Sequence, residues 1–129
     1  MALHKDLPIY KTAYDLLTNA IKITASFPRD FKRLMGDEIR KECMAITLLI
    51  FRANVATNKI PHIDELLEHL QIIELTLRLS RDMRFISTKQ YAQVIEYTDA
   101  VGKQAQGWKK QQIAAAPAAE PSGQLSLCV

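Results

Sequence analysis

An all-α, antiparallel up-down-up-down four-helix bundle, followed by a disordered C-terminal tail, is the fold class that the sequence predicts. Apolar residues recur every three or four positions in four segments, which is the pattern of amphipathic helices. Glycine and proline fall almost entirely between these segments, and the connections are short, which favours antiparallel neighbours. The chain of 129 residues suits one domain. We expect the bundle over residues 1–112 and an Ala/Pro/Ser-rich tail over residues 113–129.

The first helix is expected over residues 7–27. The second helix is expected to begin between residues 30 and 37 and to end at about residue 58. Pro8 suits a first helical turn, and Pro28 closes the first helix because the residue before a proline avoids the α region. Gly36 leaves the start of the second helix open. The apolar stripes expected to enter the core are Ile9, Ala13, Leu16, Ala20, Ile23 and Phe27, and Ile39, Cys43, Ile46, Ile50 and Ala53.

The third and fourth helices are expected over residues 62–84 and from residue 88 to about residue 112. Acidic residues begin the third helix and arginines end it, which suits the helix dipole. Ser87 and Gln90 fit a capping box, and Ile86 and Tyr91 stand at the positions of a hydrophobic staple. The expected core residues are Ile63, Leu66, Leu70, Ile73 and Leu77, and Tyr91, Val94, Ile95, Thr98, Val101, Gly102, Ala105 and Trp108.

Composition narrows the class of protein. No apolar run approaches the roughly 18 to 20 residues that a membrane span requires, and residues 1–7 do not resemble a signal peptide, so we expect a cytoplasmic protein without a membrane partner. Two cysteines, Cys43 and Cys128, supply neither a disulfide framework nor a zinc knuckle. A formal net charge of +3 permits binding to nucleic acid without requiring it.

The second and third helices each carry an apolar row in addition to the core stripe. One reading is that the bundle core is wide and the second helix is its most buried member. The other is an interface between identical copies, because large exposed apolar patches on soluble proteins mark association sites. We favour the interface. Its predicted residues are Met44, Leu48, Phe51 and Val55 on the second helix, and Ile72, Leu75, Leu79 and Met83 on the third.

Basic residues gather at one end of the predicted bundle, where the first connection and the third connection meet. Clustered arginine and lysine side chains neutralise phosphates and give salt-sensitive binding that is largely independent of nucleotide sequence. The alternative is that these residues complement a helix dipole or are ordinary solvated charges. The predicted contacts to nucleic acid or to a polymerase are Arg29, Lys32, Arg33, Arg40, Lys41, Arg78, Arg81 and Arg84.

Enzyme motifs are missing from the sequence. It contains no P-loop, no Gly-x-Ser-x-Gly and no His-Glu-x-x-His, and we expect no catalytic residue and no cofactor. His62, Glu65 and His69 share one side of the third helix, but no second cluster completes a metal shell, so we expect no metal site. An enzymatic role would be revealed by a stoichiometric metal in the purified protein.

Several short strings, in this order and spacing, resemble a known family. They are Leu7-Pro8-Ile9-Tyr10-Lys11, Ser26-Phe27-Pro28-Arg29, Gly36-Asp37-Glu38-Ile39-Arg40-Lys41-Glu42, Arg52-Ala53-Asn54, Leu77-Arg78-Leu79, Val101-Gly102-Lys103 and Gly107-Trp108. The chain resembles the accessory variability determinant proteins of diversity-generating retroelements over about residues 7–110. These proteins are similar in turn to the four-helix-bundle proteins encoded by intervening sequences in bacterial ribosomal RNA genes.

The resemblance implies a non-enzymatic accessory protein that forms a pentameric barrel. It also implies that this homo-oligomer binds a reverse transcriptase and RNA or DNA, to support mutagenic reverse transcription of a template RNA. The alternative within the same fold is a protein of the ribosomal RNA intervening-sequence type, a self-associating or RNA-binding module without a polymerase partner. The first half of the third helix is acidic, which departs from the strongly basic surface of the family. We therefore expect weaker affinity for nucleic acid and a larger role for binding to the polymerase. The acidic residues are Asp64, Glu65, Glu68 and Glu74.

Overall fold

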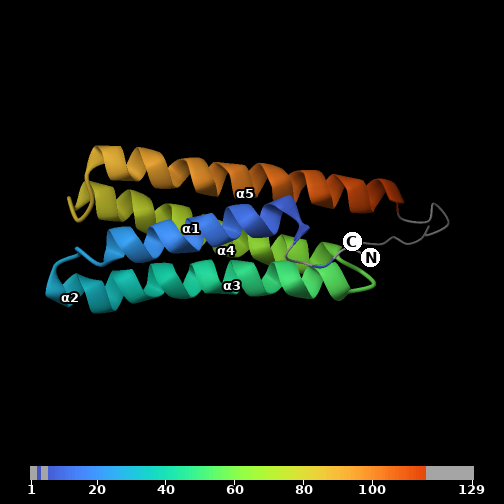
Figure 1. Cartoon of the computed structure of the whole chain (residues 1–129), viewed down its shortest axis with the longest axis horizontal. Coiled ribbons are helices and arrows are strands. Elements are labelled where there is room, and N and C mark those ends of the chain that lie inside the picture. The colour runs from blue at the N-terminus through green and yellow to red at the C-terminus, as the bar shows by residue number, and fades with distance from the viewer. Residues whose placement is uncertain (1–2, 4–5, 116–129) are drawn as a thin grey trace, which may run out of the picture.

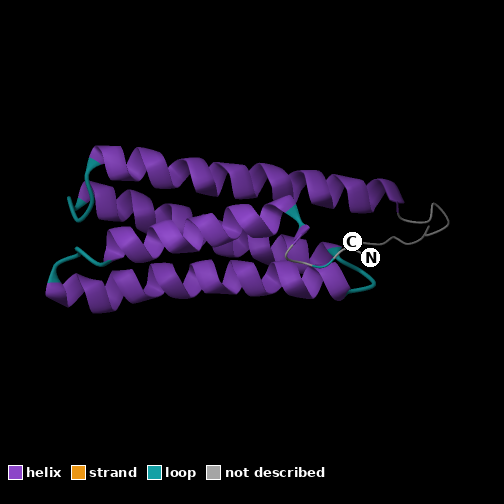
Figure 2. Ribbon diagram, viewed as in Figure 1, coloured by secondary structure: helices purple, strands orange, loops and turns teal. Residues whose placement is uncertain are grey.

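The computed structural model describes residue 3 and residues 6–115, and within them the predicted all-α four-helix bundle is confirmed. The long helices are α1 (Pro8–Thr24), α3 (Asp37–Val55), α4 (Ile60–Asp82) and α5 (Thr88–Ala115). A short helical segment, α2 (Arg29–Phe31) followed by the π-helical η2 (Lys32–Gly36), leads into α3. Neighbouring helices run antiparallel (Figures 1 and 2), and none of the described residues lies in a strand.

The order of the helices around the bundle is α1, α3, α4 and α5. Each of these helices packs against the next, and α5 packs against α1 to close the bundle, so α1 lies diagonally across from α4. The core stripes predicted for the first three helices are buried in full, and Val94, Thr98, Val101 and Ala105 complete the core from α5. No described helix is long and apolar enough to cross a membrane.

The first helix ends three residues before its predicted limit. Thr24 is the last residue of α1, and Pro28 stands four positions further on. A proline ring clashes with the carbonyl group of the residue four positions before it, which stops the helix at that point. Phe27 is buried all the same, in the turn that follows α1.

Gly36 lies inside a helical path and does not break it. The chain is helical from Arg29 onward and passes through one π turn before α3. A Cβ atom on Gly36 would lie 3.4 Å from the Cβ atom of Thr24 and 3.3 Å from Nη1 of Arg40. The missing side chain therefore allows η2 to approach the end of α1 closely, which the local sequence does not reveal.

The third predicted helix is displaced by two residues at both ends. It begins at Ile60 because Pro61 fits within its first turn, as prolines commonly do. It ends at Asp82 because Arg84 adopts a left-handed conformation with a φ angle of 64°. The last predicted helix continues to Ala115 in place of Gln112, so residues 113–115 are helical, while the rest of the predicted tail lies outside the described residues.

The predicted capping box at the start of α5 is confirmed. The amide of Gln90 donates a hydrogen bond to Oγ of Ser87 at 3.0 Å, and the amide of Ser87 donates one to Oε1 of Gln90 at 2.9 Å. Ile86 is buried beside this turn, and Tyr91 packs against the core. This reciprocal pair satisfies two backbone donors that a helix start would otherwise leave unpaired.

Candidate interaction surfaces

The predicted basic residues share one end of the bundle. The end of α1, the α2–η2 segment, the end of α4 and the start of α5 meet there, at the left of Figure 1. Six of the eight predicted contact residues have exposed side chains. These exposed residues are Arg29, Lys32, Arg33, Lys41, Arg78 and Arg84, and Lys89 adds a further exposed cation.

The other two predicted contacts, Arg40 and Arg81, have partners within the protein. Nη1 of Arg40 donates a hydrogen bond to Oγ1 of Thr24 at 2.6 Å, and Nη2 of Arg40 contacts Oδ1 of Asp37. Arg81 forms an ion pair with Asp82 at 2.9 Å, and its guanidinium lies 4.6 Å from the ring centroid of Tyr91. These two arginines help to order the basic end, so a ligand would compete with existing contacts for them.

An aromatic cluster closes the core beneath the basic residues. The ring of Phe85 lies 4.6 Å from that of Phe31 and 5.4 Å from that of Phe27, measured between centroids. The amide of Phe85 donates to the carbonyl of Ser80 at 2.8 Å, and the amide of Arg84 donates to that of Arg81 at 2.9 Å. These two bonds form a Schellman motif, which ends α4 and directs Phe85 back toward the cluster.

Both predicted second apolar rows face away from the core. All eight side chains predicted for the interface have between 40% and 64% of their surface exposed. The wide-core reading does not account for these rows, because a wide core would have sealed Leu48, Phe51, Leu75 and Leu79 inside the single chain. Exposed apolar surface of this extent is typical of an association site.

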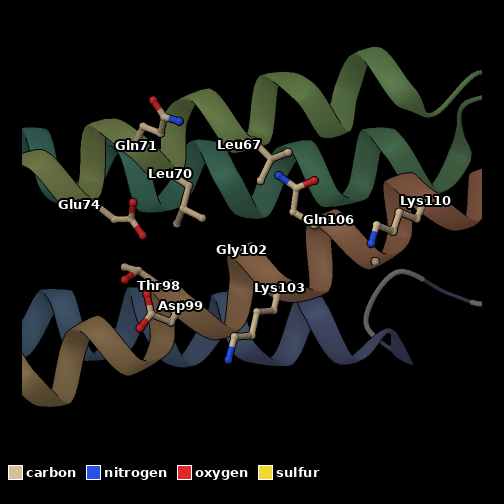
Figure 3. Close-up of a pocket in the computed structure, with 11 residues that line it drawn as sticks. Leu67, Leu70, Gln71, Glu74, Thr98, Asp99, Gly102, Lys103, Gln106 and Lys110 are labelled. Carbon is tan, nitrogen blue, oxygen red and sulfur yellow. The ribbon is translucent and has the colours of Figure 1, made fainter. Parts of the chain in front are cut away.

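A groove between α4 and α5 was not predicted from the sequence. It is open to solvent and has a volume of about 520 Å³, and its lining includes Leu70 and Gly102 (Figure 3). A Cβ atom on Gly102 would lie 3.3 Å from Cδ2 of Leu70, so the glycine lets the two helices approach. Lys103 and Lys110, two exposed cations of α5, also line the groove.

Two carboxylates, Glu74 and Asp99, line the other end of this groove (Figure 3). Partial burial raises the pKa of Glu74, and the negative charge of Asp99 raises it further. A hydrogen bond with the Thr98 side chain and the charge of Arg78 act in the opposite direction. This end of the groove is therefore acidic and disfavours phosphate, so the candidate nucleic-acid surface stays at the basic end.

A polar pair of the buried Glu42 and the partly exposed His69 joins α3 to α4. Oε1 of Glu42 contacts Nδ1 of His69, and Nε2 of His69 lies 3.8 Å from Oε2 of Glu65. This pair gives His69 a packing role. Within the described part of the chain, no group of three or more His, Cys, Asp or Glu residues could hold a metal ion. Burial raises the pKa of Cys43 to about 12, so its thiol is not a nucleophile near neutral pH.

The fold and these surfaces define a helical-bundle protein with a basic end and with exposed apolar rows on α3 and α4. Residues 7–112 match the family described as bAvd-like. The chain therefore belongs to the bAvd-like family, the accessory variability determinant proteins that its sequence resembles. The family is one of accessory proteins. No curated protein matches the chain.

Proposed function

We propose that this protein is a non-enzymatic, cytoplasmic accessory factor of a diversity-generating retroelement. In this role it assembles with copies of itself into a ring, such as a pentameric barrel, and binds a reverse transcriptase and nucleic acid during mutagenic copying of a template RNA. The family match over residues 7–112 is the observation that carries the proposal. The exposed cations at one end of the bundle and the exposed apolar rows on α3 and α4 are consistent with it.

The basic end is the surface proposed to contact nucleic acid or the polymerase. Each phosphate neutralised by a side chain releases counterions, so binding weakens as salt rises, with a slope of about 0.9 per contact on duplex DNA and about 0.7 on single strands. Repetition of the basic end around a ring would multiply the number of contacts. Arg29, Arg33 and Arg84 suit the test because their side chains are exposed.

The test replaces Arg29, Arg33 and Arg84 together with glutamate. Binding of a labelled single-stranded RNA is measured by fluorescence anisotropy over a series of salt concentrations. We expect weaker binding and a shallower salt dependence, with about 0.7 lost from the slope for each phosphate contact. The matched control reverses Arg52, Lys103 and Lys110, three exposed cations that lie away from the basic end, and so changes the net charge by the same amount. Equal losses in the two triple variants would contradict the assignment of the basic end.

Polymerase binding is tested separately with a reverse transcriptase from a diversity-generating retroelement. The same two triple variants are compared in a co-purification with that polymerase, with RNA removed by nuclease. Loss of the polymerase in the first variant and its retention in the control would assign the basic end to protein binding as well.

A second candidate function is a self-associating structural bundle without a nucleic-acid role. Its supporting observation is that Arg40 and Arg81 are engaged within the protein and that the groove between α4 and α5 has an acidic end. This candidate predicts oligomers in solution and no shift of labelled RNA at moderate salt. The anisotropy measurement therefore separates it from the accessory factor.

A further inference from the structure

A small pocket lies between the start of α1 and the last turns of α5, at the right of Figure 1. It is open to solvent and has a volume of about 270 Å³. Trp108, the only tryptophan of the chain, is partly exposed and packs against the core from this site. Leu3, in the segment before α1, is 59% exposed and so does not cover the pocket. The lining residues are Leu7, Pro8, Ile9, Gln104, Trp108 and Gln111. Most of them are apolar, so the pocket suits an apolar side chain.

The chain leaves α5 on the side of this pocket. Gln104, Trp108, Gln111 and Ala115 follow one another at spacings of four, three and four, so they share one face of α5. Ala115 is the last residue of α5. It stands seven positions after Trp108, which corresponds to about 10 Å along the helix axis. The residues that follow α5 therefore begin close to the pocket and on its side of the helix.

The segment of residues 116–129 contains two leucines that the bundle could cover. Leu125 and Leu127 are separated by Ser126, so in an extended conformation both leucine side chains point to the same side. The preceding part of the segment consists mostly of alanine, proline, serine and glycine, and it has too little apolar volume to form a core of its own. The leucines can therefore leave water only against an apolar surface of the bundle.

This segment is long enough to return to the pocket. Leu125 stands ten positions after Ala115, a length that spans up to about 33 Å when extended. The way back to Trp108 along α5 is about 10 Å, so the chain can reverse its direction with length to spare. Residues that favour turns stand in the intervening stretch. These residues are Pro117, Pro121 and Gly123.

We infer that Leu125 and Leu127 bind in this pocket of their own chain, against Trp108 and Pro8. The inference is independent of the proposed function and of self-association. The bound segment covers the exposed part of the Trp108 ring and connects the end of α5 to the start of α1. Another apolar peptide reaches the pocket only when this segment is displaced, so the contact is autoinhibitory for the pocket.

Tryptophan fluorescence tests the contact, because Trp108 is the only tryptophan. Acrylamide quenching and the emission wavelength are compared between the full chain and a variant that stops after Ala115. We expect the quenching constant of the full chain to be lower by at least about twofold, with emission at a shorter wavelength, because a covered indole ring is shielded from water and from the quencher. Equal quenching in the two proteins would overturn the inference. Circular dichroism at the same protein concentration checks that both keep their helical content.

Point variants of the full chain assign the contact to the two leucines. Leu125→Ser combined with Leu127→Ser is expected to raise the quenching constant to that of the shortened chain. Ser122→Ala combined with Ser126→Ala is the matched control, because it changes two residues of the same segment and keeps both leucines. The control should quench like the full chain. A double leucine variant that does so as well would overturn the assignment.

A mixing experiment separates a contact within one chain from a contact between copies. Trp108→Phe supplies a full chain without tryptophan fluorescence. After joint refolding with the variant that stops after Ala115, it is expected to leave the quenching of Trp108 in the shortened chain unaltered. Protection of Trp108 in the mixture would place the segment on a second copy and would overturn the intramolecular contact.

Discussion

The Thr24 hydroxyl joins α1 to α3 by accepting a hydrogen bond from Nη1 of Arg40 at 2.6 Å. The same hydroxyl donates a hydrogen bond to the carbonyl oxygen of Ala20 at 2.7 Å. Thr24 is fully buried, whereas the Arg40 side chain is 28% exposed and also contacts Asp37. Gly36 stands beside this contact without a side chain. One buried hydroxyl therefore adds a polar contact to the apolar packing between α1 and α3.

Thr24→Val is expected to lower the free energy of unfolding by about 1 to 2 kcal/mol, because it leaves a charged donor without its buried acceptor. Urea unfolding at a fixed protein concentration measures the change. Thr18→Val is the control, since that hydroxyl is bonded to the carbonyl of Tyr14 in its own helix, and its loss should cost less than about 0.5 kcal/mol. Equal losses would show that the contact with Arg40 does not contribute.

Arg84→Gly is expected to raise the free energy of unfolding by about 1 kcal/mol. The φ angle of Arg84 is 64°, a conformation that is costly for residues with a Cβ atom and free for glycine. Arg84→Val should have the opposite effect, because branching at Cβ increases the clash. Arg78→Gly, inside α4, removes the same charge and should lower stability by about 1 kcal/mol. Thermal and urea unfolding of the three variants give the comparison.

The two glycines of α5 should respond differently to alanine. Gly107 has no atom within 4 Å of an added Cβ, so Gly107→Ala should gain most of the helix propensity difference, about 1 kcal/mol. Gly102→Ala places its methyl group 3.3 Å from Cδ2 of Leu70, which must move. We therefore expect a smaller gain or a loss. A gain at Gly102 equal to that at Gly107 would mean that Leu70 adjusts without cost.

Glu74→Gln is expected to stabilise the fold more at pH 7 than at pH 4. Burial and the charge of Asp99 raise the pKa of Glu74 above its ordinary value of 4.5. Protonation of Glu74 therefore contributes stability that is fully present below pH 4.5 and is lost as pH rises through the raised pKa. Urea unfolding at the two pH values measures the difference between the variant and the original chain.

Two further variants test the cause of this pH dependence. Asp99→Asn removes the neighbouring charge and should reduce the pH dependence due to Glu74, without abolishing it, because burial is the larger cause. Glu96→Gln on the exposed side of α5 controls for the loss of one carboxylate. The explanation fails if Glu96→Gln and Glu74→Gln change stability equally at both pH values.

Sequence periodicity was sufficient for the fold class, the core stripes of α1, α3 and α4, and the start of α5. Apolar spacing and the Ser87–Gln90 capping box depend on residues within a few positions of one another. The second apolar rows on α3 and α4 could also be predicted, because they too depend on the spacing of residues along one helix. The predicted helix ends were less accurate. α1 ends at Thr24 because of a clash with Pro28, and α4 ends at Asp82 because Arg84 adopts a left-handed conformation.

Tertiary structure alone decided what lies across from each side chain. Arg40 looked like one more surface cation in the sequence, yet it is held by Thr24, which stands 16 positions earlier in the chain. Only the structure shows that Tyr14 and Ile21 of α1 are about half exposed. Helical spacing defines which residues share a face, but the packing of the other helices determines which faces remain in water.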